Sequence, residues 1–401
     1  MTTGAPDRDR LPVTIVSGYL GAGKTTLLNH VLTNQQGYRV AVLVNDMGEI
    51  NVDAQAIARE NEAEGIIDLS NGCICCRLQG DLLEEAHSLA QSRDFNALLV
   101  ESSGISEPVP VARVFLEGTP DSDVDPTAHF DLDSMVTVVD AFGFWKEFDA
   151  GESLPGGAPD PERPMSEVLI EGIEFCDLLV LNKCDLVPDD VLDEIDATLE
   201  TLQPEARRVH TVGSEVDPGL VIDTGRFDFE AVRRSPGWKR RLASGEHDHD
   251  QNTQHDHNHG HDHPPAATRA GVSSIVFESP EPFDPAALAG WLEPADWDGS
   301  ILRTKGVCHV AGTDDVIGVS QAGPSVRAGP IGTWEPDDDR VTRLVIIGRD
   351  LEEAAIRAAL EGCLLEAVEG AGDDGGDGQG QSGPSTDPDP DAVFPLEAVA
   401  K

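Results

Sequence analysis

The sequence predicts an α/β protein with a mostly parallel, doubly wound sheet, followed by a smaller α+β domain. Two observations support this prediction. Short apolar runs of strand length alternate with helix-compatible stretches, which is the pattern of strand–helix–strand crossovers in a parallel sheet. A low-complexity run over 245–263 then interrupts the 401-residue chain, and beyond it the composition returns to that of a globular domain.

The first expected strand, LPVTIVS over 11–17, stops at Gly18, and the helix-compatible stretch TTLLNHVLTN follows a group of glycines. Similar runs recur along the first half of the chain. The later strands are expected at 40–44, 97–100, 135–139 and 178–181, and two helices at 82–92 and 189–202. Two segments rich in Asp, Pro and Gly, 118–133 and 150–164, are interpreted as surface insertions.

The part after the low-complexity run supplies enough elements for a domain of roughly one hundred residues. These elements are a strand at 271–278, a helix at 285–292, a closing strand at 342–347 and a closing helix at 351–363. From Glu366 onward the chain is acidic and rich in Gly and Pro, which is typical of a disordered tail. The predicted organisation is a flexible N-terminus 1–10, a first domain 11–235, a histidine-rich linker 236–268, a C-terminal α+β domain 269–365 and an acidic tail 366–401.

The charge balance limits the class of partner. The chain has 74 acidic and 28 basic residues, a formal net charge of −46, which disfavours nucleic acid and anionic membranes as partners. Only six basic residues are lysines, a balance interpreted as halophilic, because screening over about 3 Å at 1 M salt weakens self-repulsion. An acidic protein of a mesophilic organism is the alternative. No apolar stretch approaches the ~20 residues that span a bilayer, and the N-terminus lacks the apolar core of a signal peptide. A cytoplasmic protein is expected.

A phosphate-binding loop lies between the first strand and the first helix. The sequence GYLGAGKT over 18–25 matches G-x-x-x-x-G-K-[ST] without a gap. In such a loop the backbone N–H groups surround phosphate oxygens, the lysine reaches the β- and γ-phosphates and the threonine ligates Mg²⁺. The predicted nucleotide-binding residues here are Gly18, Gly21, Ala22, Gly23, Lys24, Thr25 and Thr26, with Lys24 and Thr25 also catalytic.

Two further strand ends extend this site. Glu101 ends the strand LLVE and stands where a second Mg²⁺-linked acid is expected, and Gly104 is placed to sense the γ-phosphate through its N–H. The motif Asn182-Lys183-Cys184-Asp185 follows the strand LLVL. There the Asp185 carboxylate can accept from guanine N1–H and the exocyclic amine, Asn182 can reach the guanine edge and the Lys183 stem can cover the base. Adenine offers no such donor pair, so GTP is favoured over ATP. Residues 211–214 are expected to complete the base pocket through backbone groups.

A cysteine cluster, Gly72-Cys73-Ile74-Cys75-Cys76, lies between the second strand and the strand that ends in Glu101. Three of the seven cysteines in four positions suit a soft or borderline ion such as Zn²⁺. A carboxylate such as Glu49, or a water, could be the fourth ligand of a site at Cys73, Cys75 and Cys76. A thiol redox switch and buried inert cysteines are the alternatives.

Together these motifs resemble those of the CobW-type metallochaperone GTPases. The resemblance rests on GYLGAGKTT, the segment 45–53, GCICC, E-S-S-G and N-K-C-D, and in the closing domain on RTKG over 303–306 and Trp334. It implies slow GTP hydrolysis coupled to delivery of Zn²⁺, or in some branches Co²⁺, to a client metalloprotein. Asp46, expected to be catalytic, stands where the family usually has Glu, and a carboxylate one methylene shorter could serve Mg²⁺ through water.

The low-complexity run holds seven of the twelve histidines. Neutral imidazoles interleaved with Asp can bind Zn²⁺, Ni²⁺, Co²⁺ or Cu²⁺ with little selectivity. We interpret this run as a flexible arm that gathers metal ions, and the alternative is a solvated spacer. The histidines of this arm are His247, His249, His255, His257, His259, His261 and His263.

The leading hypothesis is a GTP-dependent metallochaperone with GTP, Mg²⁺ and Zn²⁺ (or Co²⁺) as its ligands. In it, GTP·Mg²⁺ would order the segment 46–53 and assemble the cysteine site, and hydrolysis would release the ion to a client. One alternative is a zinc buffer or sensor with a storage arm and a structural nucleotide. Another is a nickel or cobalt insertion GTPase. A homodimer is left open.

Overall fold

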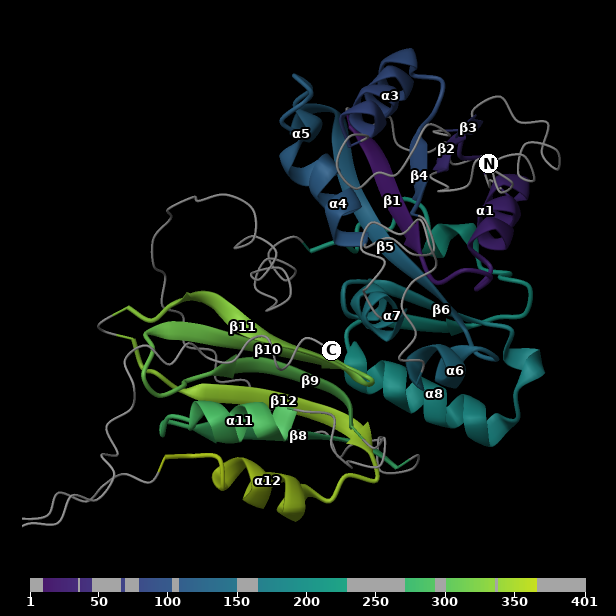
Figure 1. Ribbon diagram of the computed structural model, residues 1–401. Helices are drawn as coiled ribbons and strands as arrows, with labels where there is room; N and C mark the ends of the chain where they lie inside the picture. The colour runs from purple at the N-terminus through teal and green to yellow at the C-terminus, as the bar shows by residue number, and fades with distance from the viewer. Residues whose placement is uncertain are drawn as a thin grey trace, which may run out of the picture. The chain divides into compact units, whose positions relative to one another are not determined.

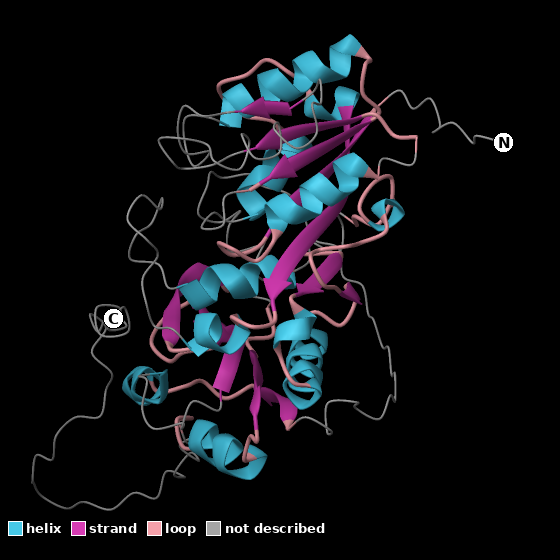
Figure 2. Cartoon of the chain, turned by 90° about the vertical axis from the view of Figure 1, so that its right-hand side faces the viewer, coloured by secondary structure: helices cyan, strands magenta, loops and turns pink. Residues whose placement is uncertain are grey.

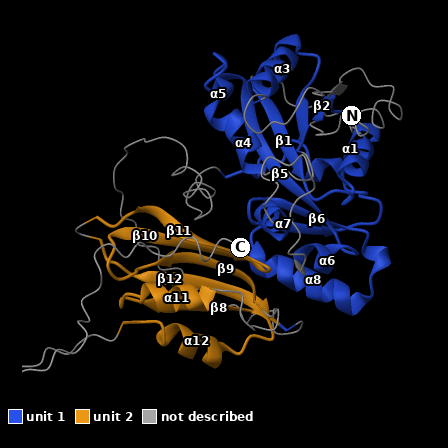
Figure 3. Ribbon diagram, in the orientation of Figure 1, with its two compact units in different colours: residues 1–238, 265–271 blue, residues 239–264, 272–401 orange. Residues whose placement is uncertain are grey.

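The computed structural model describes residues 10–34, 37–44, 66–68, 79–102, 108–149, 165–228, 271–292, 301–335 and 338–365. These residues form two compact units, one of residues 10–228 together with Gly271 and the other within 272–365 (Figure 3). The domain boundaries expected at 235 and 268 lie outside the described residues.

The first unit is built on a parallel sheet with the strand order β3-β2-β4-β1-β5-β6-β7 (Figure 1). Every strand pair in it is parallel, which confirms the predicted sheet. The strands are β1 (Leu11–Ser17), β2 (Val40–Val44), β3 (Ile66–Asp68), β4 (Ala97–Glu101), β5 (Phe130–Asp140), β6 (Leu178–Asn182) and β7 (Arg207–His210). The helices are α1 (Lys24–Thr33), α3 (Gln79–Ser92), α4 (Pro108–Glu117), α5 (Pro126–His129), α6 (Phe144–Asp149), α7 (Met165–Glu174) and α8 (Asp189–Leu202).

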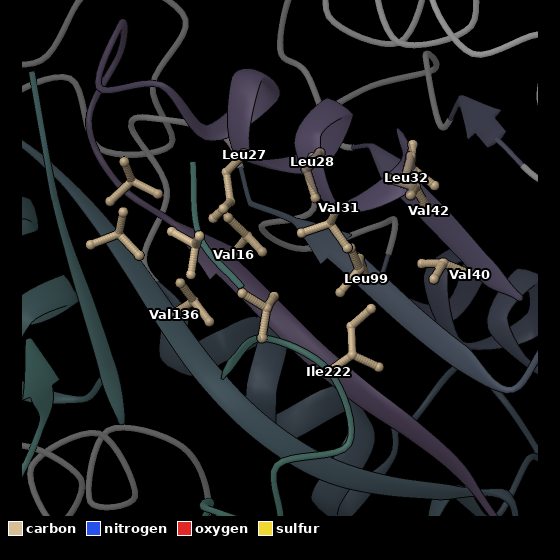
Figure 4. Packing of buried hydrophobic residues seen from close by; sticks show 14 of the residues in the cluster. Val16, Leu27, Leu28, Val31, Leu32, Val40, Val42, Leu99, Val136 and Ile222 are labelled. Atoms are coloured by element: carbon tan, nitrogen blue, oxygen red, sulfur yellow. The ribbon is translucent and has the colours of Figure 1, made fainter. Parts of the chain in front are cut away.

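Helices cover both faces of this sheet, as Figure 2 shows. On one face, Leu27, Leu28 and Val31 of α1 pack against strand residues such as Val16 and Val136, with which they form one apolar cluster (Figure 4). On the other face lies α7, where the Thr137 hydroxyl donates to the carbonyl of Gly172. Strands buried on both faces read as unbroken apolar runs, which is why β1, β2, β4 and β6 were predictable within one residue.

The segment 118–133 is only partly a surface insertion, and the prediction for it was wrong from residue 126 onward. Helix α5 covers Pro126–His129 and β5 starts at Phe130. Asp131 and Asp133 suggested a loop, but each carboxylate has a partner. Asp131 pairs with Arg10 at 3.4 Å. Asp133 stands at a register shift between β1 and β5 and is 4% exposed.

The buried Asp133 binds a short segment that follows β7 in the chain. Its carboxylate accepts the backbone N–H groups of Thr224 at 2.9 Å and Gly225 at 2.6 Å. Its carbonyl accepts the N–H groups of Arg226 and Phe227 at 3.1 and 3.0 Å. We call these four residues, 224–227, the strap. The strap is therefore fixed to the half of β5 that lies away from the carboxyl ends of the strands.

The second unit is an antiparallel sheet with the strand order β11-β10-β9-β12-β8, packed against two helices. Its core includes Phe283, which bridges to Val310 and Leu364, and the buried Leu288 and Leu360 from the two helices. This architecture confirms the predicted α+β domain, although the middle strands were not predicted. The elements are β8 (Val272–Ser279), α11 (Pro285–Leu292), β9 (Ile301–Cys308), β10 (Asp315–Ala322), β11 (Ser325–Thr333), β12 (Thr342–Arg349) and α12 (Glu353–Glu361).

Candidate functional site

The carboxyl ends of the parallel strands gather most of the described residues that the sequence singled out. β1 lies between β4 and β5. The chain continues from β1 to β2, β3 and β4 on one side of it, and then crosses from β4 to β5 on the other side. Ligands of open α/β sheets bind at such a switch point. The phosphate loop follows β1, Glu101 ends β4, and the base motif starts at the last residue of β6.

The phosphate loop has a backbone that requires glycine. Gly18, Gly21 and Gly23 have φ of +137°, +77° and +111°, in the region that a Cβ atom disfavours. At Gly18 the restriction is also steric, because an added Cβ would collide with the carbonyl oxygen of Val138 on β5. The first position of the motif therefore admits only glycine in this conformation.

The Lys24 side chain lies inside the phosphate loop and binds carbonyls of that loop. The residue is 7% exposed, and its ammonium donates to the carbonyl of Gly18 at 2.8 Å and to that of Tyr19 at 3.3 Å. The cation and the positive end of α1 thus face the same enclosure. This arrangement is suited to binding the phosphate groups of a nucleotide.

Asn182 joins the phosphate loop to the base motif and to the loop after β7. It is 3% exposed, and its amide donates to the carbonyl of Ala22 at 2.9 Å. Its Oδ1 atom accepts from the backbone N–H of Ser214 at 2.8 Å and from the hydroxyl of Thr211 at 3.2 Å. Three loops are therefore held through one side chain. The contact of Asn182 with the guanine edge stays a prediction.

Ser214 completes this connection from the other side. Its hydroxyl donates to the carbonyl of Gly23 at 3.0 Å, and a Cβ added at Gly23 would meet both the Asn182 amide and, at 2.7 Å, the Ser214 hydroxyl. The glycine is thus needed for contact between loops as well as for its own backbone angle. The sequence motif alone could not show this second requirement.

The base motif turns sharply after Asn182. Lys183 has φ +60°, and residues Cys184–Leu186 form one 3₁₀ turn, which leaves Asp185 exposed. The Lys183 ammonium lies 2.6 Å from Oδ2 of Asp140, the last residue of β5. Asp140 was not predicted as a site residue, although it ends an apolar strand run with a carboxylate, as Glu101 does.

Glu147, on the first turns of α6, adds a second carboxyl group beside this pair. Burial, together with the charge of Asp140, raises the pKa of Glu147 to about 7. Lys183, Lys146 and Lys24 lower this pKa but do not offset the burial. Near neutral pH, Glu147 is therefore divided between its neutral and charged forms.

Thr25 and Glu101, the two predicted Mg²⁺ ligands, both lie close to the phosphate loop. Glu101 is 2% exposed and lies beside Val16 of β1, at the start of the phosphate loop. Thr25 stands in the first turn of α1. A hydroxyl and a carboxylate are hard oxygen donors of the kind that Mg²⁺ prefers. The chemistry of these residues fits the ion.

Several predicted site residues lie outside the described residues. They are Asp46, Glu49, Cys73, Cys75, Cys76, Gly104, His247, His249, His255, His257, His259, His261 and His263. In the described part of the chain, no three His, Cys, Asp or Glu side chains are grouped as metal ligands. The described cysteines Cys176, Cys184, Cys308 and Cys363 are free thiols whose pKa values burial raises. None of the described helices combines the length and apolar character needed to span a bilayer.

Known proteins resemble both units. The model of the CobW/HypB/UreG nucleotide-binding domain matches residues 12–210, and that of the cobalamin synthesis protein CobW C-terminal domain matches 272–364. The zinc-regulated GTPase metalloprotein activator 1 of Dictyostelium discoideum is 33% identical over 90% of this chain and 81% of the relative. The zinc chaperone CobW of a Sinorhizobium species is 28% identical over 90% of this chain and 99% of the relative.

Among solved structures, the Zn(II)-bound YjiA GTPase from E. coli matches 89% of this chain and 99% of that chain, with 21% identity and a TM-score of 0.40. The family assignment rests on the two domain models and on the relatives in sequence. The chain belongs to the CobW/HypB/UreG family and is a P-loop GTPase with a CobW C-terminal domain.

Proposed function

We propose that this chain is a GTP-dependent metallochaperone. It binds Zn²⁺, or Co²⁺, at Cys73, Cys75 and Cys76, and transfers the ion to a client metalloprotein as it slowly hydrolyses GTP. The observation that carries the proposal is the connection of the phosphate and base loops through Asn182, in a chain that also carries the GCICC motif. Relatives named zinc chaperones support the choice of zinc.

The described residues would act on GTP by position and charge. Lys24 would exchange its loop carbonyls for phosphate oxygens, and the exposed Asp185 would accept from the guanine edge. Thr25 and Glu101 would hold Mg²⁺, which neutralises charge on the β- and γ-phosphates when it is bound. Asp46 remains a proposed second carboxylate of this site.

The position of GCICC in the sequence supports coupling between the metal and GTP. The motif lies between β2 and the β4 strand that ends in Glu101, where a P-loop GTPase responds to the γ-phosphate. If GTP orders this region and thereby assembles the thiolate site, GTP and metal must strengthen each other's binding by the same factor. Loss of the γ-phosphate would then release the ion.

The test is a competition titration of Zn²⁺ and Co²⁺ under reducing conditions, with and without a non-hydrolysable GTP analogue. It uses the full chain, the chain without 245–263, and that deleted chain with Cys73, Cys75 and Cys76 changed to Ser. The proposal expects one tight site that survives the deletion, strengthens with the analogue and disappears with the cysteines. Loss of most bound metal on deletion alone would favour the zinc buffer or sensor. A thiolate site indifferent to the analogue would overturn the coupling.

A further inference from the structure

The turn after β5 holds a carboxylate in a fixed position next to the base motif. Asp140 is 7% exposed, and its Oδ1 atom accepts the backbone N–H of Phe142 at 3.0 Å. Its Oδ2 atom takes the Lys183 ammonium at 2.6 Å. The backbones are joined as well, because the N–H of Ala141 donates to the carbonyl of Asn182 at 2.9 Å. Both carboxylate oxygens of Asp140 are therefore engaged, one by the turn and one by Lys183.

The contact with Asp140 fixes the tip of the Lys183 side chain. The left-handed backbone of Lys183 starts the 3₁₀ turn that carries Asp185, and its side chain remains 31% exposed while the ammonium is paired. A lysine held at its tip presents its four methylene groups as an apolar surface. A free lysine would lose rotamer freedom when a ligand packs against it, and this loss weakens binding.

We propose that Asp140 is a positioning residue for the nucleobase: by holding the Lys183 ammonium, it sets the Lys183 stem as the surface on which the guanine ring lies. This inference rests on the proposed role of residues 182–185 as the base motif. Asp140 does not touch the nucleotide. It acts by fixing Lys183 before the nucleotide arrives.

Glu147 is a second carboxyl group beside Asp140. A Cβ added at Gly143 would lie 2.7 Å from Oε1 of Glu147 and 3.3 Å from Oδ2 of Asp140, so the two carboxyl groups flank the same point. Burial raises the pKa of Glu147 to about 7.

The experiment measures the affinity of the full chain for GDP, ADP and tripolyphosphate by calorimetry. The test variant is Asp140→Asn, and the matched control is Asp131→Asn, which removes an exposed ion pair at the other end of the same strand. Asp140→Asn should weaken GDP about 5- to 10-fold, the scale of one charge-assisted contact that is partly exposed. The affinity for tripolyphosphate should change less than about twofold, because this ligand has no base. The control variant should leave the affinities for GDP and tripolyphosphate unchanged.

A second series separates positioning from support of the fold. Lys183→Met keeps an apolar stem without the charge and should weaken GDP binding less than Lys183→Ala does. In the Lys183→Met background, Asp140→Asn should have less than about a twofold further effect, because the two act as a unit. If Asp140→Asn does not fold, the Lys183 variants still test the stem, and equal loss of GDP and tripolyphosphate in them would overturn the proposal.

Two other results would count against it in distinguishable ways. Equal loss of GDP and tripolyphosphate in Asp140→Asn, or an undiminished loss in the Lys183→Met background, would make Asp140 a structural residue only and leave the base motif intact. A wild-type chain that binds ADP as tightly as GDP would remove the premise about residues 182–185, and with it this inference.

Discussion

The predicted nucleotide site has two halves, one for the phosphates and one for the base, and they are built by different means. The phosphate half, residues 18–25, is one uninterrupted loop whose shape is set by glycine backbone angles and by Lys24 bound to carbonyls of its own loop. The base half is assembled from the ends of β5, β6 and β7 and is held by the side chains of Asp140, Asn182 and Ser214. A local motif specifies the first half, whereas the second exists only after the sheet has formed.

The largest effect is expected from breaking the phosphate half at its backbone. Gly18→Ala places a methyl group against the carbonyl of Val138 in a backbone region that alanine avoids. Such strain amounts to about 1–3 kcal/mol, and relieving it must move the loop, so nucleotide affinity should fall roughly 100-fold. Calorimetry with GDP measures this.

The control for this change is Gly37→Ala. Gly37 also has a positive φ, +96°, but an added Cβ there meets nothing within 4 Å and lies at the opposite end of α1. This variant should be slightly less stable and should bind GDP normally. Equal loss of affinity in both variants would show that general destabilisation, and not the shape of the loop, weakens binding.

A smaller effect is expected where the two halves are joined. Asn182→Ala removes one donor and one acceptor and leaves the N–H of Ser214 and the carbonyl of Ala22 without this partner. The unfolding free energy should fall by about 2–3 kcal/mol and the affinity for GDP and tripolyphosphate should fall about tenfold. Denaturant titration and calorimetry measure the two quantities.

Asn96→Ala is the matched control for Asn182. The Asn96 Oδ1 atom also accepts a backbone N–H, that of Arg39 at 2.7 Å, but at the amino ends of β2 and β4. It should lower stability without changing nucleotide affinity. If Asn182→Ala weakened GDP and left tripolyphosphate unchanged, the two halves would be less connected than the hydrogen bonds indicate.

The smallest expected effect concerns Glu147 and depends on pH. Its folded pKa of about 7 lies above the ordinary value of 4.5, so the folded state keeps a proton that the unfolded state releases. Stability therefore falls as the pH rises from about 4.5 to about 7, and the loss is constant above that. Glu147→Gln removes this penalty and should be more stable than the wild type at pH 8 by about 1–2 kcal/mol, with little difference near pH 4.5.

Denaturant unfolding of the wild type and of Glu147→Gln across this pH range measures the difference in their unfolding free energies. Asp177, whose pKa burial raises to about 6, adds a similar slope, but it is common to both chains and cancels. The control is Glu117→Gln, which alters an exposed carboxylate paired with Arg113. Its unfolding free energy should change with pH in the same way as that of the wild type. Parallel curves for Glu147→Gln would mean that Glu147 is ionised at no cost.

The contrast between the two halves explains what the sequence could predict. Strands β1, β2, β4 and β6 and the phosphate loop are continuous patterns, so they were predicted from neighbouring residues, whereas β3 and β7 were not predicted. Asp140 lies 43 positions from its partner Lys183, and only the pairing of β5 with β6 brings them together. A polar residue at the end of an apolar strand is the signal that could have found it. Asp133 misled the prediction because its carboxylate binds backbone N–H groups from residues 224 and 225.

The second unit was less predictable for a related reason. β9, β10 and β11 contain polar residues and glycines that interrupt the alternation of a half-buried strand, and β10 has a register shift at Val316. Its hairpin turns on Gly323 and Pro324, between the paired residues Ala322 and Ser325. These pairings are set by the whole sheet, so a single strand does not reveal them.

The strap over Asp133 has a consequence for how such a protein can diversify. It fixes residues 224–227 on the half of β5 remote from the carboxyl ends, so a change in the length of the chain after residue 228 is not transmitted to the nucleotide loops through this segment. Each doubling of a flexible connection costs only about 0.6 kcal/mol in closure entropy. Evolution can therefore lengthen, shorten or rewrite the later part of the chain, including the histidine-rich run, and exchange the second unit, while one inherited nucleotide site is retained.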